Sequence, residues 1–237
     1  MKYFKDPARQ IGWLFVLATV AGVLSVLVMR STLGDENLLA ASRANQGSLL
    51  LGEMLIFFML AAMVGTAVLL GPILRRHSET FALGYVLART LEVVMIAIGL
   101  VAGLLLVPLS WSTADGAELV GADVLAETLR NASDWTGYLG AQMIFSISAL
   151  VLNWAFLRYG LIPRWLSVWG LVGVPLMFLS GLLVMFESLN SSASALNLLV
   201  VPLAVQEMAM AVWLIVKGVS EATEPDSELE AAPPLRA

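Results

Sequence analysis

Apolar residues gather in six long runs along the chain, with short polar segments between them. Each run has roughly 20 residues, the length that crosses the hydrocarbon core of a bilayer as an α-helix. The first run is longer than the apolar core of a typical signal peptide, so we expect an uncleaved anchor. The pattern predicts an all-α polytopic integral membrane protein, a bundle of six transmembrane helices. The expected spans are 11–30, 48–71, 82–109, 136–158, 165–186 and 195–217.

Composition supports a membrane domain followed by a polar tail. Hydrophobic residues make up 59% of the chain and charged residues only 13%, against about 25% charged residues in an average soluble domain. We expect residues 1–218 to form the transmembrane domain. Residues 219–237 are acidic and contain three prolines, which predicts a disordered cytoplasmic tail.

The distribution of basic residues predicts the orientation, because cytoplasmic loops carry an excess of Lys and Arg. With the N-terminus inside, most basic residues fall in inner segments, and only Arg30, Arg43 and Arg130 fall in outer loops. We therefore expect an inner (plasma) membrane protein with both termini cytoplasmic. The long outer loop 110–134 is expected either to contain a short interfacial helix, with Val120, Val124, Leu125 and Leu129 on one face, or to be a solvated loop with helical propensity.

The third span carries charge and small residues on one helix face. Arg89 and Glu92 are three residues apart, so they can form an ion pair. Gly99 and Gly103 on the same face form a GxxxG pattern, which lets another helix approach closely. We expect this stripe to face the bundle; it consists of Tyr85, Arg89, Glu92, Ile96, Gly99 and Gly103.

The fourth span has a row of small and polar residues at helical spacing: Gln142, Ser146, Ala149 and Asn153. One interpretation is the lining of a polar path through the membrane. The other is hydrogen bonding between helices, at about 0.6 kcal/mol per bond on average.

The sixth span places Gln206 and Glu207 about halfway through the membrane. Pro202 lies one turn earlier and leaves the Leu198 carbonyl without its usual backbone donor. Ala204 and Ala211 share a face with Glu207, so a neighbouring helix could pack closely there. Two interpretations stay open for this region, a kink that opens a polar site and an ordinary proline bend.

The charges inside the spans do not balance. Arg89 is the one cation, whereas Glu53, Glu92 and Glu207 are three potential anions. Glu53 lies near the outer end of the second span, where it can extend toward the interface. If Arg89 pairs with Glu92, Glu207 lacks a partner, and we hypothesise that it is protonated at rest or holds a cation, as in proton relays. The competing hypothesis is that Arg89 bridges both glutamates and locks three helices together.

Several kinds of chemistry are excluded by the residues themselves. The chain has no cysteine and a single histidine, His77, in an inner loop. A buried Ser–His pair, bis-His haem ligation and His or Cys metal sites are therefore not expected. We expect no cofactor and no metal. A basic surface with aromatic residues, as nucleic-acid binding would require, is also missing from the sequence.

Two stretches resemble a known family. The segment from Arg158 to Gly170, Arg-Tyr-Gly-Leu-Ile-Pro-Arg-Trp-Leu-Ser-Val-Trp-Gly, and the last span, from Pro202 to Gly218, are similar to those of the membrane protein family described as domain of unknown function 4386. The Arg89 and Glu92 spacing matches its third span as well. The resemblance implies a bacterial polytopic protein and implies no particular activity.

The loop between the fourth and fifth spans also has a direct physical interpretation. Arg158 and Arg164 flank Pro163 on the inner side, near Trp165 and Trp169. Tryptophan favours the membrane interface, so the loop is expected to be an anchored hairpin. A second interpretation is that the two arginines bind anionic lipid headgroups.

Three hypotheses on function follow from these residues. The first is a small proton-linked transporter or permease with a polar interior made of Arg89, Glu92, Gln142, Ser146, Asn153, Gln206 and Glu207. The second is a structural or regulatory membrane subunit whose buried charges hold helices together; it predicts a closed, dry bundle. The third is an enzyme acting on lipids with a glutamate base. We rank it last because the sequence offers no helper histidine or metal site.

Overall fold

The computed structural model describes residues 3–4, 6–35, 37–112, 120–186 and 193–220. Its described part is almost entirely helical, and six helices are long and apolar enough to cross a membrane. The all-α, six-span prediction is therefore confirmed. The spanning helices are α1 (Asp6–Leu33), α3 (Gln46–Arg75), α4 (Glu79–Ser112), α5 (Ala122–Tyr138) continued by the π-helix η1 (Leu139–Ile144) and α6 (Phe145–Tyr159), α7 (Arg164–Phe186) and α8 (Ala193–Val216).

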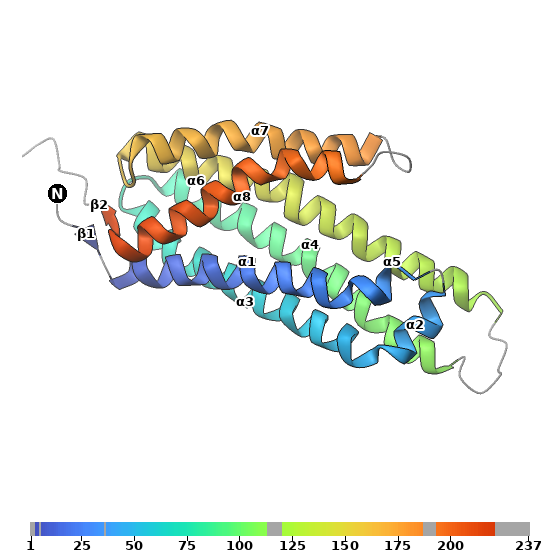
Figure 1. The fold of residues 1–237 in the computed structure, drawn as a ribbon. Coiled ribbons are helices and arrows are strands. Elements are labelled where there is room, and N and C mark those ends of the chain that lie inside the picture. The colour runs from blue at the N-terminus through green and yellow to red at the C-terminus, as the bar shows by residue number, and fades with distance from the viewer. Residues whose placement is uncertain (1–2, 5, 36, 113–119, 187–192, 221–237) are drawn as a thin grey trace, which may run out of the picture.

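The region expected as a long outer loop is where the sequence interpretation was wrong. Helix α5 is neither a separate interfacial helix nor a solvated loop, because it runs without a break through η1 into α6 (Figure 1). Its segment contains no proline, and Ala126 is buried in a cluster with Leu106 and Leu109 of α4. Packing against the long α4 thus extends the fourth span. Val120 and Val124 remain exposed at its start.

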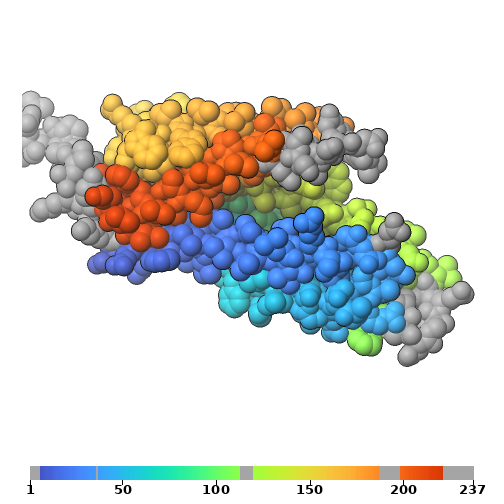
Figure 2. Space-filling model, in the orientation of Figure 1, coloured from blue at the N-terminus to red at the C-terminus, as the bar shows by residue number. Residues whose placement is uncertain are grey.

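Helix α4 lies at the centre of the bundle. It packs against α3 on one side and against α5, η1 and α6 on the other, while α7 packs on α6 and α8. Helix α1 packs between α3 and α8. In Figure 2, α1 and α8 touch near the end of the bundle that carries β1 and β2, and they diverge toward the opposite end, where the yellow-green part of the chain is visible between them.

Both ends of the described chain meet at one end of the bundle, called here the termini end. Strand β1 (Tyr3–Phe4) pairs antiparallel with β2 (Val219–Ser220). The Ser220 backbone N–H donates to the Leu161 carbonyl at 2.9 Å, so the loop after α6 joins the same assembly. The expected tail begins at 219, and only its first two residues, which form β2, are described. Residues 221–237 lie outside the described residues.

The small residues of α4 allow close helix contacts, as the GxxxG pattern predicts. A Cβ atom added at Gly99 would lie 2.7 Å from Thr136 Oγ1 and 3.2 Å from the Ser133 carbonyl oxygen of α5. A Cβ atom at Gly103 would collide with the Glu53 carboxylate of α3. Glu53 therefore does not extend to the interface. It is buried between α3 and α4, where Gly103 leaves the space for it.

Candidate functional site

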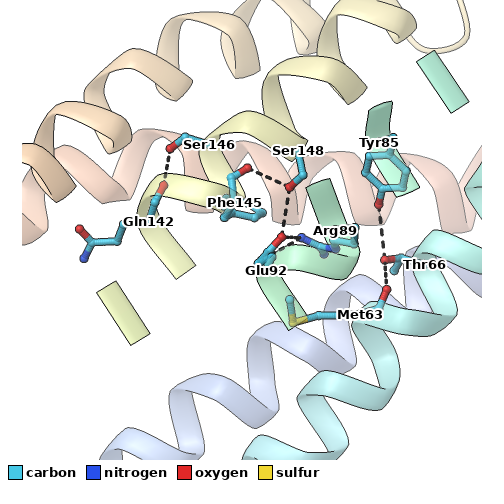
Figure 3. Close-up of polar contacts among 9 residues, drawn as sticks. All are labelled: Met63, Thr66, Tyr85, Arg89, Glu92, Gln142, Phe145, Ser146 and Ser148. Carbon is cyan, nitrogen blue, oxygen red and sulfur yellow. Dashed lines mark hydrogen bonds and ion pairs between the residues drawn. The ribbon is translucent and has the colours of Figure 1, made fainter. Parts of the chain in front are cut away.

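An ion pair is buried in the middle of α4. The Arg89 Nη1 atom donates to both carboxylate oxygens of Glu92, at 3.2 Å to Oε1 and 3.0 Å to Oε2 (Figure 3). Both side chains are about 96% buried or more. They form because α4 is regular here and residues three apart share a face. The predicted pair is confirmed, and the whole stripe from Tyr85 to Gly103 faces the bundle.

Helix α6 completes the surroundings of the pair. The Ser148 hydroxyl lies 3.1 Å from Glu92 Oε2 and 2.9 Å from the Phe145 carbonyl oxygen of its own helix, and it can donate to either. The Arg89 guanidinium lies 5.5 Å from the Phe145 ring centroid and 5.7 Å from that of Phe15 on α1. At these distances the two rings make cation–π interactions with Arg89, and such interactions stabilise a desolvated guanidinium. Arg89 thus holds α1, α4 and α6 together.

A second polar contact lies one turn before Arg89. The Tyr85 hydroxyl is 3.4 Å from Thr66 Oγ1 of α3, and the Thr66 hydroxyl donates to the Met63 carbonyl at 2.7 Å (Figure 3). Tyr85 and Thr66 are fully buried. The contact ties α4 to α3 and satisfies the phenol without water.

On the other side of the cluster, α8 is joined to α6 and α7. The Gln206 amide Nε2 donates to Asn153 Oδ1 at 3.0 Å and to the Leu166 carbonyl at 3.1 Å. Asn153 in turn donates to the Ala149 carbonyl of its own helix at 2.9 Å. Gly170 on α7 leaves the space that the Asn153 amide fills. Hydrogen bonds of this kind are the usual polar contacts between membrane helices.

Glu207 lies on a small interior cavity of about 10 Å³, near the smallest space that holds one water molecule. The cavity is lined by residues of α1, α4, α6 and α8, which include Phe15, Tyr85, Arg89, Ser148, Asn153, Gln206 and Glu207. Glu207 makes no hydrogen bond or ion pair within 4 Å to any residue of the described part. The Arg89 Nε atom is likewise buried without a partner. Two of the three charged groups in the cluster thus keep unused bonding capacity.

The row predicted on the fourth span divides into separate parts. Ser146 donates to the Gln142 carbonyl of its own helix, and the Gln142 side chain lies near Gly181 of α7, its Oε1 buried without a hydrogen bond. Neither residue lines the interior cavity. The row as a whole lies along α7, because Asn153 fills the space at Gly170 as Gln142 does at Gly181. Of its four residues, only Ala149 and Asn153 line the cavity.

Ala204 and Ala211, which the sequence places on the same face as Glu207, differ in their burial. Ala211 is fully buried and its backbone carbonyl lies against Gly12 of α1, which confirms close packing on that side. Ala204 is exposed instead. Helix α8 thus turns only the half of this face nearest the termini end toward α1, since the two helices diverge beyond it (Figure 2).

Sequence reasoning missed two partners of the ion pair, Ser148 and Phe145. A serine inside an apolar span is common, so its type alone gave no signal. Phe145 and Phe15 look like ordinary apolar packing in the sequence. What joins them to Arg89 is the packing of α1 and α6 on α4, which no local pattern encodes.

The carboxylates of this cluster can exchange protons and can bind water or a small cation. Among the described residues, no three His, Cys, Asp or Glu side chains lie close enough to hold a metal ion. If both glutamates are ionised, one arginine leaves the cluster with a net charge of −1. A proton or a small cation on Glu207 would neutralise it.

One protein family matches the part of the chain that contains this polar cluster. The family model "Domain of unknown function (DUF4386)" matches residues 10–218, from the second turn of α1 to the residue before β2. The chain belongs to the DUF4386 family. No curated protein and no solved structure matches the chain. The DUF4386 match includes every residue of the cluster described above and ends before the acidic tail.

The structure explains the DUF4386 segment that carries the resemblance, Arg158 to Gly170. Gly160 ends α6 with a positive φ of 63°, a conformation that favours glycine. Leu161 and Ile162 then turn into the core at the termini end and are buried. Pro163 precedes α7, and its carbonyl accepts from the Leu166 N–H at 3.0 Å. The segment is thus a hairpin between α6 and α7 that is held by the buried Leu161 and Ile162.

Proposed function

We propose that this DUF4386 protein is a small proton-linked transporter or permease in which Glu207 binds and releases a proton beside the Arg89–Glu92 pair. The observation that carries the proposal is the position of Glu207 on the interior cavity without an ion partner, while Arg89 is already paired with Glu92. Intramembrane carboxyl groups that lack a fixed counter-ion are typical of proton relays.

Two helices beside the cavity contain local irregularities that support movement. The π-helix η1 directly precedes α6, and π-helical turns are frequent at functional sites. Pro202 interrupts the hydrogen-bond ladder of α8 one turn before Gln206 and Glu207. In the proposed cycle, protonation of Glu207 changes its attraction to Arg89 and shifts α8 relative to α6, so that the cavity opens to one side and then to the other.

The proposal includes the orientation expected from the sequence. The termini end carries the inner-side arginines, including Arg75, Arg158 and Arg164. Arg30 and Arg43 lie in the last turns of α1 and α2 (Leu38–Ala44) on the opposite side, and Arg130 lies within α5 on that side. The positive-inside rule then places both termini in the cytoplasm and the protein in the plasma membrane. Exposed Arg164 and Trp165 at this end support binding of anionic lipid headgroups.

A test of the proton site is infrared difference spectroscopy in lipid. The parent protein is expected to show a protonated-carboxyl band whose intensity changes reversibly with bulk pH, and the band should be lost in Glu207→Gln. The matched control is Glu79→Gln, which removes an exposed carboxyl and should leave the band unchanged. A pH-sensitive band that Glu207→Gln leaves undiminished, or the lack of any such band in the parent, would refute Glu207 as the proton site.

A second candidate function, a structural or regulatory membrane subunit, is favoured by one observation. The interior cavity has room for about one water molecule, which fits the closed bundle that this function predicts. In that case the polar contacts only hold α1, α4, α6 and α8 together. The two functions differ in one measurable respect, because a transporter must open the cavity to water and a structural subunit keeps it closed.

A further inference from the structure

A groove on the membrane-facing side of α3 and α4 lies apart from the interior cavity. It consists of two connected hollows of about 360 and 380 Å³, which share Gly71, Pro72 and Val86. Volumes above about 300 Å³ are typical of small-ligand sites. One hollow begins at Arg75 and Glu79 at the termini end, and the other reaches Arg89, Thr90 and Val93.

Small residues open the groove between the two helices. Gly71 has no side chain, and a Cβ atom there would already come within 3.2 Å of Val86 Cγ2. Ala67 and Ala82 line the same depression. Pro72 has no backbone N–H, so the Val68 carbonyl lacks its helical donor. The walls are otherwise aliphatic, which suits a hydrocarbon chain.

The length of the groove matches one leaflet of a bilayer. From Glu79 to Val93, α4 rises roughly 21 Å at the usual helical rise. One leaflet comprises about 15 Å of hydrocarbon and a headgroup layer of about 5–7 Å. A lipid whose headgroup lies at the termini end would therefore place its tail along Arg89, with the end of the tail near Val93. The groove opens sideways into the lipid, and a ligand dissolved in water would not need a site that opens in that direction.

Charge at the mouth of the groove specifies the headgroup. Arg75 Nη2 and Glu79 Oε1 form an ion pair of 3.0 Å with side chains 71% and 65% exposed. Exposed pairs of this kind contribute little to stability, so both groups can exchange partners. A zwitterionic headgroup offers a phosphate for the guanidinium and an ammonium for the carboxylate. An anionic headgroup would satisfy Arg75 and be repelled by Glu79.

From this geometry we propose that the α3–α4 groove binds one phospholipid with a phosphoethanolamine headgroup, whose tail reaches the outer side of Arg89. Arg89 lines both the groove and the interior cavity. The bound tail therefore lies against Arg89 from the lipid side and adds a further layer between the buried cluster and the bilayer. The site stands on the groove itself and does not depend on transport.

The tail part of the site is tested by native mass spectrometry with dioleoyl phosphatidylethanolamine as the probe. We expect one retained lipid per chain in the parent. Val68→Trp fills the groove, and Leu87→Trp adds the same side chain to α4 outside it; the two native residues are similarly exposed, at 63% and 67%. Loss of the contacts of two tail methylenes should weaken retention about tenfold in Val68→Trp. Retention in Leu87→Trp should equal that of the parent, and equal retention in the two variants would overturn the site.

The headgroup part is tested by competition with dioleoyl phosphatidylglycerol, an anionic lipid with the same tails. The parent should prefer phosphatidylethanolamine, and Glu79→Gln should remove most of that preference because the ammonium loses its carboxylate. Glu127→Gln, an exposed carboxyl at the opposite end, is the control and should keep the preference. A parent that prefers phosphatidylglycerol, or a preference unchanged by Glu79→Gln, would overturn the proposed headgroup.

Discussion

The substitution Glu92→Gln tests how the buried ion pair is held. It keeps the shape of the side chain and an oxygen for the Ser148 hydroxyl, but it leaves the charge of Arg89 without its partner at a position only 3% exposed. Removal of one partner from a buried pair costs about 3–5 kcal/mol. We expect a loss of about 3 kcal/mol in the free energy of unfolding, at the low end of that range because the Glu207 carboxylate lies on the same cavity and partly replaces Glu92.

The assay is equilibrium unfolding in bicelles, and double variants supply the controls. The double variant Arg89→Met, Glu92→Leu removes both charges, so it should stay within about 1 kcal/mol of the parent. Glu92→Gln combined with Glu207→Gln removes the substitute partner as well, so its cost should exceed the sum of the single costs by about 1 kcal/mol. If Glu92→Gln costs no more than the charge-free double variant, the reasoning about an uncompensated arginine is refuted.

Two further predictions concern other parts of the bundle. Gly103→Ala should destabilise the protein by about 1–3 kcal/mol because the new methyl collides with the Glu53 carboxylate; Glu53→Ala in the same chain should recover most of the loss in the same unfolding assay, and an unchanged loss would contradict the contact. Burial and the charge of Arg76 lower the pKa of His77 below its usual value, so protonation favours the unfolded chain and stability should fall as pH drops through about 6.5. Nuclear magnetic resonance titration of this single histidine should show the pKa rising in Arg76→Gln and staying constant in Arg75→Gln, and equal effects of the two substitutions would contradict the assigned cause.

The sequence predicted the parts of the structure that depend on local periodicity. Six apolar runs of spanning length became six spanning helices, because in lipid only a helix satisfies the backbone of such a run. The pair Arg89–Glu92 could be predicted since both residues lie on one turn of α4. The buried face of α4 followed from the same 3.6-residue period.

The parts that were missed depend on contacts between distant segments. Ser148 lies 56 residues from Glu92 in the chain, and it reaches the carboxylate because α6 packs on α4. Gln142 falls inside η1 and still faces α7, as Asn153 does, so the predicted row is kept. Which of its residues reach the cavity depends on where α1 and α8 pack, and that is not encoded in the spacing. Burial of Glu53 requires the space at Gly103. The GxxxG pattern predicts that another helix packs closely there, but it does not predict which helix or which side chain.

The most direct test of the transport proposal is whether the interior cavity opens to water. The chain has no cysteine, so Ala149→Cys places a single thiol on the cavity wall with little change in volume. In proteoliposomes, a membrane-impermeant thiosulfonate is added to one side or to the other, and Ser112→Cys at the exposed end of α4 reports that the reagent is active. Alternating access predicts that Ala149→Cys is labelled from each side, and labelling from neither side or from one side only would contradict it.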